Sequence, residues 1–114
     1  MGRVIAFEVT PEFLKSAKIL SKRYRSFPED LKTIRKEISE NLNIGDDLGN
    51  GVRKIRMAIK SKGKGKRGGA KIITFTVEVD EKLSKVTFLY VYDKSDMSNI
   101  SDNKIKQIIA DNKI

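Results

Sequence analysis

Hydrophobic and polar positions follow two different periods along this chain. Residues 4–9 alternate with a period of two, which predicts a first strand. Thr10 and Pro11 then favour the start of a helix, because threonine caps free backbone N–H groups and proline suits the first helical position. We expect Val9 and Leu14 to pack together as a hydrophobic staple across that start. The apolar stripe of this helix comprises Phe13, Leu14, Ala17, Leu20 and Tyr24.

A second amphipathic helix is predicted directly after the first. Ser26 and Glu29 have the spacing of a capping box, and apolar residues then recur every three or four positions. These apolar positions are Leu31, Ile34, Ile38 and Leu42. Because only residues 25–27 separate the two helices, we expect them to form an antiparallel hairpin. Residues 43–51, which are rich in Gly, Asn and Asp, predict an irregular connection.

The next stretch, residues 52–59, alternates again and predicts a strand with one basic, solvated face. Lys54 and Arg56 lie on that face. The opposite face, which carries Ile55, should meet the helices. Residues 60–69 offer almost no side chain for burial, so we expect them to form a mobile loop.

Two further strands should follow the loop. Residues 70–80 and 85–93 predict an antiparallel hairpin with its turn at residues 81–84. We expect one apolar set from each strand to point toward the core. These sets are Ile73, Phe75 and Val77 on the first strand and Val86, Phe88 and Tyr90 on the second.

A short helix should close the chain. Ser101 is expected to be its N-cap, and Ile100 and Ile105 its staple, while Ile105, Ile108 and Ile109 form its buried stripe. The order strand, helix, helix, three strands, helix predicts an α+β fold. In this fold an N-terminal strand and an antiparallel helical hairpin pack on a small antiparallel sheet, followed by the short C-terminal helix. With 39% hydrophobic residues, residues 1–114 suit a single domain.

The amino-acid composition narrows the chemistry. The chain has no Cys and no His, which excludes disulfides, thiolate catalysis, cysteine-based zinc sites and imidazole general bases. We therefore expect no metal and no cofactor, and chemistry that uses Lys, Arg, Tyr or carboxylates. No apolar run approaches the roughly 18 residues that span a bilayer, and the early charges at the N-terminus are unlike a signal peptide. We expect a cytoplasmic protein with no membrane partner.

Positive charge is concentrated in one segment of the chain. The 24 Lys and Arg residues outnumber the 15 Asp and Glu residues, which gives a net charge of +9. Between Leu48 and Val77 there is no acidic residue, while nine cations occur there, and outside this segment the two signs balance. The nine are Arg53, Lys54, Arg56, Lys60, Lys62, Lys64, Lys66, Arg67 and Lys71. Such a localised patch indicates a polyanionic partner.

Lysine alternates with glycine in residues 60–69, which combines dense charge with a backbone that can approach a phosphate. A solvated turn is the alternative interpretation, but the cations continue into the preceding strand, which favours phosphate binding. The glycines lead into a strand and lack the GxxxxGK[ST] pattern, so a nucleotide-hydrolysing P-loop is not expected. Of Tyr90 and Tyr92, we expect Tyr92 to stack on unpaired nucleic-acid bases, because it lies at a strand end. The expected contacts to the nucleic-acid backbone are Lys60, Lys62, Lys64, Lys66 and Arg67.

The segment RKIRMAIKSKGKGKRGGAKIITF, followed by FLYVYDKSDMSNIS and a terminal helix, resembles the HigB-type branch of the RelE/ParE toxin superfamily. The resemblance combines a cationic strand, a KGKGK-x-GG-A loop, a hydrophobic strand and a YDKS-type corner in that order. It implies a small sheet packed against a helical hairpin. It also implies a toxin of a type II toxin–antitoxin system, since RelE-like members cleave messenger RNA on the ribosome and are neutralised by an antitoxin encoded alongside.

The resemblance also assigns roles to single residues. Lys54 and Arg56 take the paired basic positions of the family's cationic strand. Lys71 takes the position after GGA where an arginine is usual, and Lys94 takes the basic position of the corner. Lysine at position 71 keeps the charge but lacks the bidentate fork of arginine. The tyrosine that some RelE members carry after the corner corresponds to Ile100, so that acid–base group is absent.

The implied reaction needs no metal. An RNA 2′-hydroxyl attacks the adjacent phosphorus, leaving a cyclic phosphate and a free 5′-hydroxyl, while cations stabilise charge on the nonbridging oxygens. We expect Arg56 and Lys71 to stabilise that charge, and Lys54, activated by neighbouring cations, to act as the base. Because one exposed neighbour activates a lysine only weakly, the ribosome should have to cover the site, and cleavage of free RNA should be slow.

Two other interpretations remain open from the sequence. The same cations could serve a non-catalytic RNA- or ribosome-binding module. On the ParE side of the superfamily, the protein would instead inhibit DNA gyrase without cutting nucleic acid, which leaves the cationic strand without a purpose. For the toxin interpretation the expected partners are a cognate antitoxin, messenger RNA and the ribosome. The antitoxin should mask the positive surface with acidic residues or cover the adjacent loop.

Overall fold

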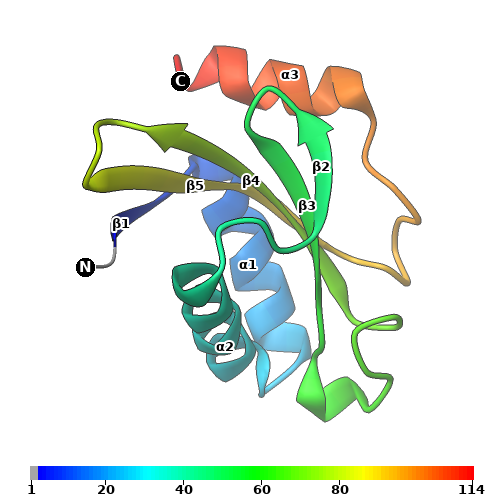
Figure 1. The fold of residues 1–114 in the computed structure, drawn as a ribbon. Coiled ribbons are helices and arrows are strands. Elements are labelled where there is room, and N and C mark those ends of the chain that lie inside the picture. Colours follow the sequence, from blue (N-terminus) through cyan, green and yellow to red (C-terminus); the bar gives the residue numbers. More distant parts are fainter. Residues whose placement is uncertain (1–2) are drawn as a thin grey trace.

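The computed structural model describes residues 3–114, so Met1 and Gly2 of the expected domain lie outside the described residues. Over this range the chain forms a five-stranded sheet, three α-helices and one short 3₁₀ helix (Figure 1). The elements are β1 (Val4–Val9), α1 (Pro11–Arg23), α2 (Phe27–Glu40), β2 (Asp46–Gly49), β3 (Val52–Met57), η1 (Lys60–Lys62), β4 (Ala70–Glu78), β5 (Leu83–Asp93) and α3 (Asp102–Asp111). The predicted α+β class is confirmed. Among residues 3–114, the structure contains no helix with the length and apolar character required to cross a membrane.

The sheet has the strand order β1-β5-β4-β3-β2. Strands β3, β4 and β5 form the predicted antiparallel meander, but β1 pairs parallel with β5, so the sheet is mixed. Strand β2 was not predicted, because the composition of residues 43–51 indicates an irregular connection. Residues 46–49 pair antiparallel with β3 although all four are exposed. Backbone hydrogen bonds alone form such an edge strand, and its side chains leave no apolar pattern in the sequence.

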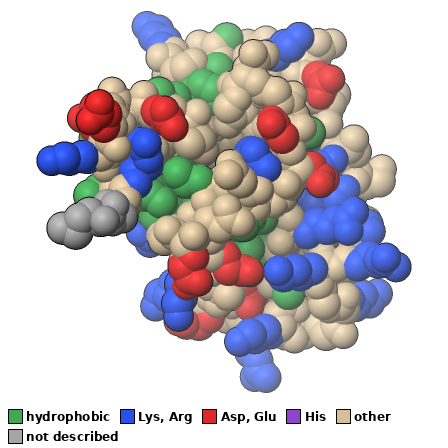
Figure 2. Space-filling model, viewed as in Figure 1, with side chains coloured by type: hydrophobic (Ala, Val, Ile, Leu, Met, Phe, Trp, Pro, Cys, Tyr) green, Lys and Arg blue, Asp and Glu red, His purple; other side chains and the backbone are tan. Residues whose placement is uncertain are grey.

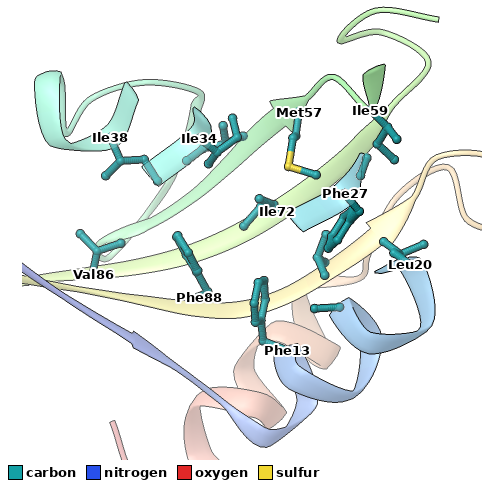
Figure 3. Packing of buried hydrophobic residues seen from close by; sticks show 14 residues of the cluster. Phe13, Leu20, Phe27, Ile34, Ile38, Met57, Ile59, Ile72, Val86 and Phe88 are labelled. Carbon is teal, nitrogen blue, oxygen red and sulfur yellow. The ribbon is translucent and has the colours of Figure 1, made fainter. Parts of the chain in front are cut away.

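Both faces of the sheet are covered. Figure 1 shows α1 and α2 on one face, with α3 crossing the other. Figure 3 shows the core between the sheet and the helical hairpin, where Phe13 and Phe27 meet Ile72 and Phe88. The core under α3 comprises Val52, Ile73, Leu89, Tyr92, Ile100, Ile105 and Ile108.

The apolar residues that were predicted to point inward from β4 and β5 do not all lie in one core. Val86 and Phe88 face the helical hairpin, whereas Ile73 and Tyr90 belong to the core under α3. Val77 is exposed. The pairing of β4 with β5 shifts register between Ile73 and Thr74, and this bulge moves the alternation by one residue. With both faces buried, a period of two no longer marks a single inward face.

The helix starts agree only partly with the sequence. Thr10 caps α1 as predicted, because its hydroxyl oxygen accepts a hydrogen bond from the Phe13 N–H at 2.9 Å. Val9 and Leu14 are both exposed, so the predicted staple does not form and Leu14 leaves the buried stripe. Ser26 stands at the start of α2 without a capping hydrogen bond from its side chain, so the predicted capping box is wrong.

Candidate functional site

Three cationic residues of β3 and β4, namely Lys54, Arg56 and Lys71, lie on one face of the sheet, whereas Arg53 lies on the other. Arg56 stands directly opposite Lys71 in the strand register, and Lys54 lies two residues before Arg56 on the same strand. Cross-strand partners and residues two apart share a face. The Arg56 side chain is exposed, while Lys54 and Lys71 are partly buried. Three of the four residues predicted to be catalytic are therefore brought together on regular structure.

The connection between β5 and α3 holds the two lysines. The Lys54 ammonium donates a hydrogen bond to Asn99 Oδ1 at 3.0 Å, and the Lys71 ammonium donates to the Ser98 carbonyl at 2.9 Å. Sequence reasoning missed Ser98 and Asn99. Nothing in their residue types marks the role, which follows from the path of the connection toward α3. These bonds fix both ammonium groups over the face that Arg56 shares.

The surroundings of Lys71 weaken the preference of its side chain for the charged form. Burial lowers the pKa of Lys71 below its ordinary value, and the charges of Lys54, Lys94 and Arg56 lower it further, while Asp46 opposes them. The sequence assigned charge stabilisation to Lys71 and proton transfer to Lys54. The surroundings of Lys71 add a second chemical possibility, because an amine with a lowered pKa can accept a proton.

The predicted loop is folded, and one of its lysines is buried. We call residues 60–69 the basic loop. It begins with η1, and Gly63 follows as the C-cap of η1 in a left-handed conformation with φ of 74°. The Lys62 side chain is only 8% exposed, and its ammonium donates to Asp93 Oδ1 at 2.6 Å and to the Ser95 hydroxyl at 2.7 Å. The Lys62 side chain is thus occupied by contacts within the protein, which argues against its predicted role as an RNA contact.

The other cations of the basic loop lie at the surface, where Lys60, Lys64, Lys66 and Arg67 are exposed. Figure 2 shows Lys and Arg side chains gathered on the right of the view, on the side where Figure 1 shows β3 leading into η1. Lys66 makes an exposed ion pair with Glu37 at 3.3 Å. Such a pair contributes about 0 to 1 kcal/mol, so RNA phosphate can replace the carboxylate.

Two surface depressions adjoin these cations. One, of about 300 Å³, lies where β3 meets α2 and is lined by Lys54, Arg56 and Lys66 together with Glu37 and Asp46. The other, of about 360 Å³, is lined by Lys64, Arg67, Gly68, Lys94 and Ser95. The fourth predicted catalytic residue, Lys94, therefore lies beside the basic loop.

Tyr92 is a core residue. Its side chain belongs to the cluster under α3, and the residue is 4% exposed. Burial raises the pKa of its hydroxyl. A base cannot stack on a ring that the protein already covers, so the structure argues against the predicted stacking role. Ile100, which stands where some RelE members carry a tyrosine, is buried in the same cluster.

Comparison with known protein families adds an independent finding. A family model described as the RelE toxin of the RelE/RelB toxin–antitoxin system matches residues 14–113. The match begins within α1 and extends past α3, so it includes β3, the basic loop and β4. Toxins of this family pair with an antitoxin. The chain therefore belongs to the RelE toxin family, as the toxin of a toxin–antitoxin system.

Proposed function

We propose that this toxin is a messenger-RNA endoribonuclease of the HigB-type branch, which acts on the ribosome in the cytoplasm. Toxins of the RelE family are generally endoribonucleases that inhibit translation. One observation carries the proposal for this chain: Arg56 and Lys71 are directly opposed across two strands, with Lys54 on the same face. Charges fixed by strand pairing suit a reaction in which negative charge develops at one phosphorus.

The proposed reaction is an internal transfer within RNA. The 2′-oxygen of a ribose attacks the adjacent phosphorus while the bond from phosphorus to the 5′-oxygen breaks. The products are a 2′,3′-cyclic phosphate and a 5′-hydroxyl. A base takes the proton of the 2′-hydroxyl, and a lysine ammonium group supplies the proton that the leaving 5′-oxygen gains. Arg56 donates to the nonbridging oxygens, since its N–H groups match their geometry.

Substrate RNA has to replace two bonds that the free protein makes to itself. The ammonium groups of Lys54 and Lys71 donate to Asn99 and to the Ser98 carbonyl. A phosphate is a stronger acceptor than either neutral oxygen, because its hydrogen bonds are assisted by charge. We therefore expect the segment at residues 98–99 to shift when RNA enters, with both lysines turning toward the phosphate that Arg56 contacts.

The function is tested by mapping transcript ends in cells that express the protein together with a translation reporter. Wild type should reduce the reporter and create new 5′ ends within translated regions. Arg56→Ala should abolish both effects, whereas Lys15→Ala, which removes an exposed charge from α1, should leave them unchanged. Unchanged transcripts with wild type would overturn the proposal. Inhibition of gyrase supercoiling in that case would favour the ParE interpretation.

The antitoxin is expected to bind by charge complementarity. The toxin has a net charge of +9, and the cations of residues 53–71 carry the excess. We propose that the contacting antitoxin segment is acidic or covers the basic loop, because like charges across an interface are costly. A neutralising partner that is basic and binds far from the loop would contradict this mechanism.

A further inference from the structure

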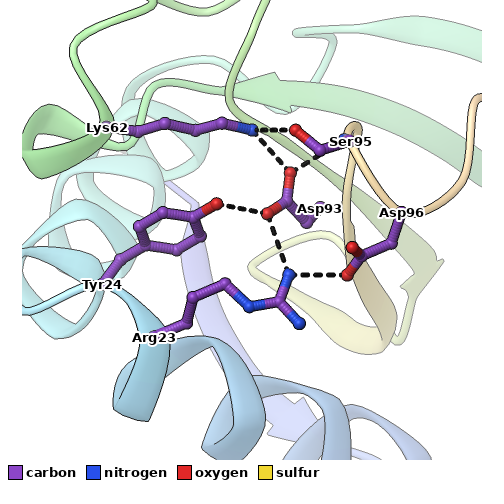
Figure 4. A network of polar contacts seen from close by, with 6 residues as sticks. All are labelled: Arg23, Tyr24, Lys62, Asp93, Ser95 and Asp96. Atoms are coloured by element: carbon purple, nitrogen blue, oxygen red, sulfur yellow. Dashed lines mark hydrogen bonds and ion pairs between the residues drawn. The ribbon is translucent and has the colours of Figure 1, made fainter.

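The corner after β5 contains a buried carboxylate with four hydrogen-bond donors. We call residues 93–96 the corner. Asp93 is 1% exposed. Its Oδ1 accepts from the Lys62 ammonium at 2.6 Å and from the Ser95 N–H at 2.9 Å. Its Oδ2 accepts from the Tyr24 hydroxyl at 2.5 Å and from Arg23 at 3.1 Å (Figure 4).

These donors come from segments that are distant in the sequence. Arg23 and Tyr24 stand at the end of α1, and Lys62 ends η1. Arg23 also donates to Asp96 at 2.6 Å, which ties α1 to the corner a second time. The corner also contacts the other end of the basic loop, where the Lys94 N–H donates to the carbonyl of Gly69 at 3.1 Å. The basic loop is therefore fastened to the corner near both of its ends.

The energetics suggest a role beyond stability. Burial opposes the charge of Asp93, but the hydrogen bonds from Lys62, Tyr24, the Ser95 N–H and Arg23 outweigh burial and hold its pKa well below the usual range. A buried ion pair is commonly no more stabilising than apolar residues of the same volume, because both charges lose their hydration. Its attested advantage is that it specifies one arrangement of the segments it joins.

The arrangement held by Asp93 brings separate cations to one place. Lys64 and Arg67 extend from the basic loop and Lys94 from the corner, and all three line the depression of about 360 Å³. The three residues are exposed. Because two segments contribute to the depression, its geometry depends on how the basic loop packs against the corner. Asp93, the first residue of the corner, joins the two segments through its contact with Lys62.

We propose that this depression is a binding subsite for an RNA phosphate next to the cleavage site, and that Asp93 is the positioning residue that assembles it. The proposal rests on the proposed function. Asp93 does not touch RNA but acts through Lys62, which fixes η1, and through the corner, which fixes Lys94. Guanidinium and ammonium donors from two segments surround one phosphate, which a flexible lysine-rich loop would hold less well.

The test measures binding of a short single-stranded RNA by fluorescence anisotropy at several salt concentrations. Asp93→Asn removes a negative charge, so simple electrostatics predicts tighter RNA binding. The positioning role predicts the opposite, namely binding at least about tenfold weaker, with a salt slope smaller by about 0.7 because the contact to one phosphate is lost. Lys64→Ala combined with Arg67→Ala should give a similar loss.

Matched controls separate positioning from charge and from folding. Asp111→Asn removes the same charge at the end of α3 and should not weaken binding. Tyr24→Phe keeps the ring but loses one donor to Asp93, so it should give a smaller loss and serves if Asp93→Asn fails to fold. Amide hydrogen exchange in residues 63–69 should accelerate in both variants while exchange in the sheet is unchanged.

The outcomes are distinguishable from failure of the proposed function. If wild type binds RNA and Asp93→Asn binds equally or more tightly, the positioning role is wrong. A loss of binding with an unchanged salt slope and unchanged exchange in the loop would also overturn it. If wild type itself neither binds nor cuts RNA, the proposed function fails instead. Retained cutting by Asp93→Asn with weaker binding supports a subsite apart from the reacting phosphate.

Discussion

At the scale of single residues, two roles compete for Lys71. An arginine at this position would serve as a permanent charge, whereas a lysine with a lowered pKa can also accept a proton. Lys71 is partly buried and surrounded by the charges of Lys54, Lys94 and Arg56. These surroundings make the neutral amine more accessible than in a free lysine, so a lysine here can take part in proton transfer that an arginine could not perform.

Lys71→Arg separates the two roles. Arginine keeps the charge, adds a bidentate fork and does not lose its proton at working pH. If Lys71 stabilises charge, ribosome-dependent cleavage by the variant should equal or exceed that of wild type. If it is the base, the single-turnover rate should fall by about 10²- to 10⁴-fold with RNA affinity retained.

The same assay on Lys54→Arg serves as the counterpart for Lys71→Arg. If Lys54 is the base, as the sequence suggests, its variant should show the large loss and Lys71→Arg should not. Full activity of both variants would exclude a lysine base at either position and would leave charge stabilisation as their shared role.

The candidate site was predictable where strand register decides it. Arg56 follows from the alternation of charged and apolar residues in residues 52–59, whereas Lys71 was assigned from the family resemblance, and the strand register places it opposite Arg56. The fates of Lys62 and Tyr92 could not be predicted from the sequence. Lys62 belongs to a run of similar lysines, and its burial follows from contacts with Asp93 and Ser95, which are 31 and 33 residues away. Tyr92 is buried because α3 covers that face of the sheet.

At the scale of secondary-structure elements, the two helix starts contain similar signals but use different contacts. Thr10 is buried, accepts from the Phe13 N–H and donates to the Leu89 carbonyl at 2.7 Å, so it joins α1 to β5. Ser26 instead donates to Asp30 and accepts from the Ser61 N–H at 2.8 Å, so it joins α2 to η1. A capping motif in the sequence identifies the capping residue but not the group to which its side chain binds.

This difference predicts unequal costs for removing the two hydroxyl groups. Thr10→Val should lower the free energy of unfolding by about 2 to 3 kcal/mol, because a cap and a buried hydrogen bond are lost together. Ser26→Ala should cost less, about 1 to 2 kcal/mol, since its exposed bond to Ser61 is replaced by water, while the buried Asp30 carboxylate loses one donor but keeps the Lys60 N–H. Urea unfolding measures both variants, and equal costs would contradict the assignment of the caps.

The basic loop depends on its glycines for two different reasons. Gly65 has φ of 63°, and a Cβ at this position would point into open space, so the cost of a side chain there is backbone strain alone. At Gly69 a Cβ would overlap the carbonyl oxygen of Met57, where the loop returns beside β3. The mixture of glycines in the sequence does not reveal which one permits a close approach, because this depends on the neighbouring strand.

Alanine substitutions should therefore separate the two positions. Gly65→Ala should cost about 1 kcal/mol of stability, the usual penalty for a left-handed residue with a side chain. Gly69→Ala should cost more, by at least about 2 kcal/mol, because backbone atoms cannot yield as a flexible side chain can. Thermal unfolding of the two variants provides the measurement, and a milder effect at Gly69 would show that the loop relaxes away from Met57.

At the scale of the whole molecule, one fold separates two kinds of charge. Surface cations of β3, the basic loop and the corner face solvent, where they are available to a polyanion. Lys62 and Asp93 are taken into the interior and join α1, η1 and β5. The surface cations favour binding of a polyanion, whereas the buried pair of Lys62 and Asp93 favours one fixed arrangement of α1, η1 and β5. Acid should therefore affect the two groups differently.

Acid unfolding follows from the sign of the Asp93 shift. Because the pKa of Asp93 is lowered in the folded state, its contribution to stability is present above its unfolded pKa of about 3.9 and is lost as the pH falls toward the folded value. Removing this partner by Asp93→Asn should cost about 3 kcal/mol near pH 7. The difference in unfolding free energy between wild type and variant should then shrink steadily between about pH 5 and pH 3. A difference that stayed constant across this range would mean that the carboxylate contributes through packing, and that its charge does not fasten the basic loop to the corner.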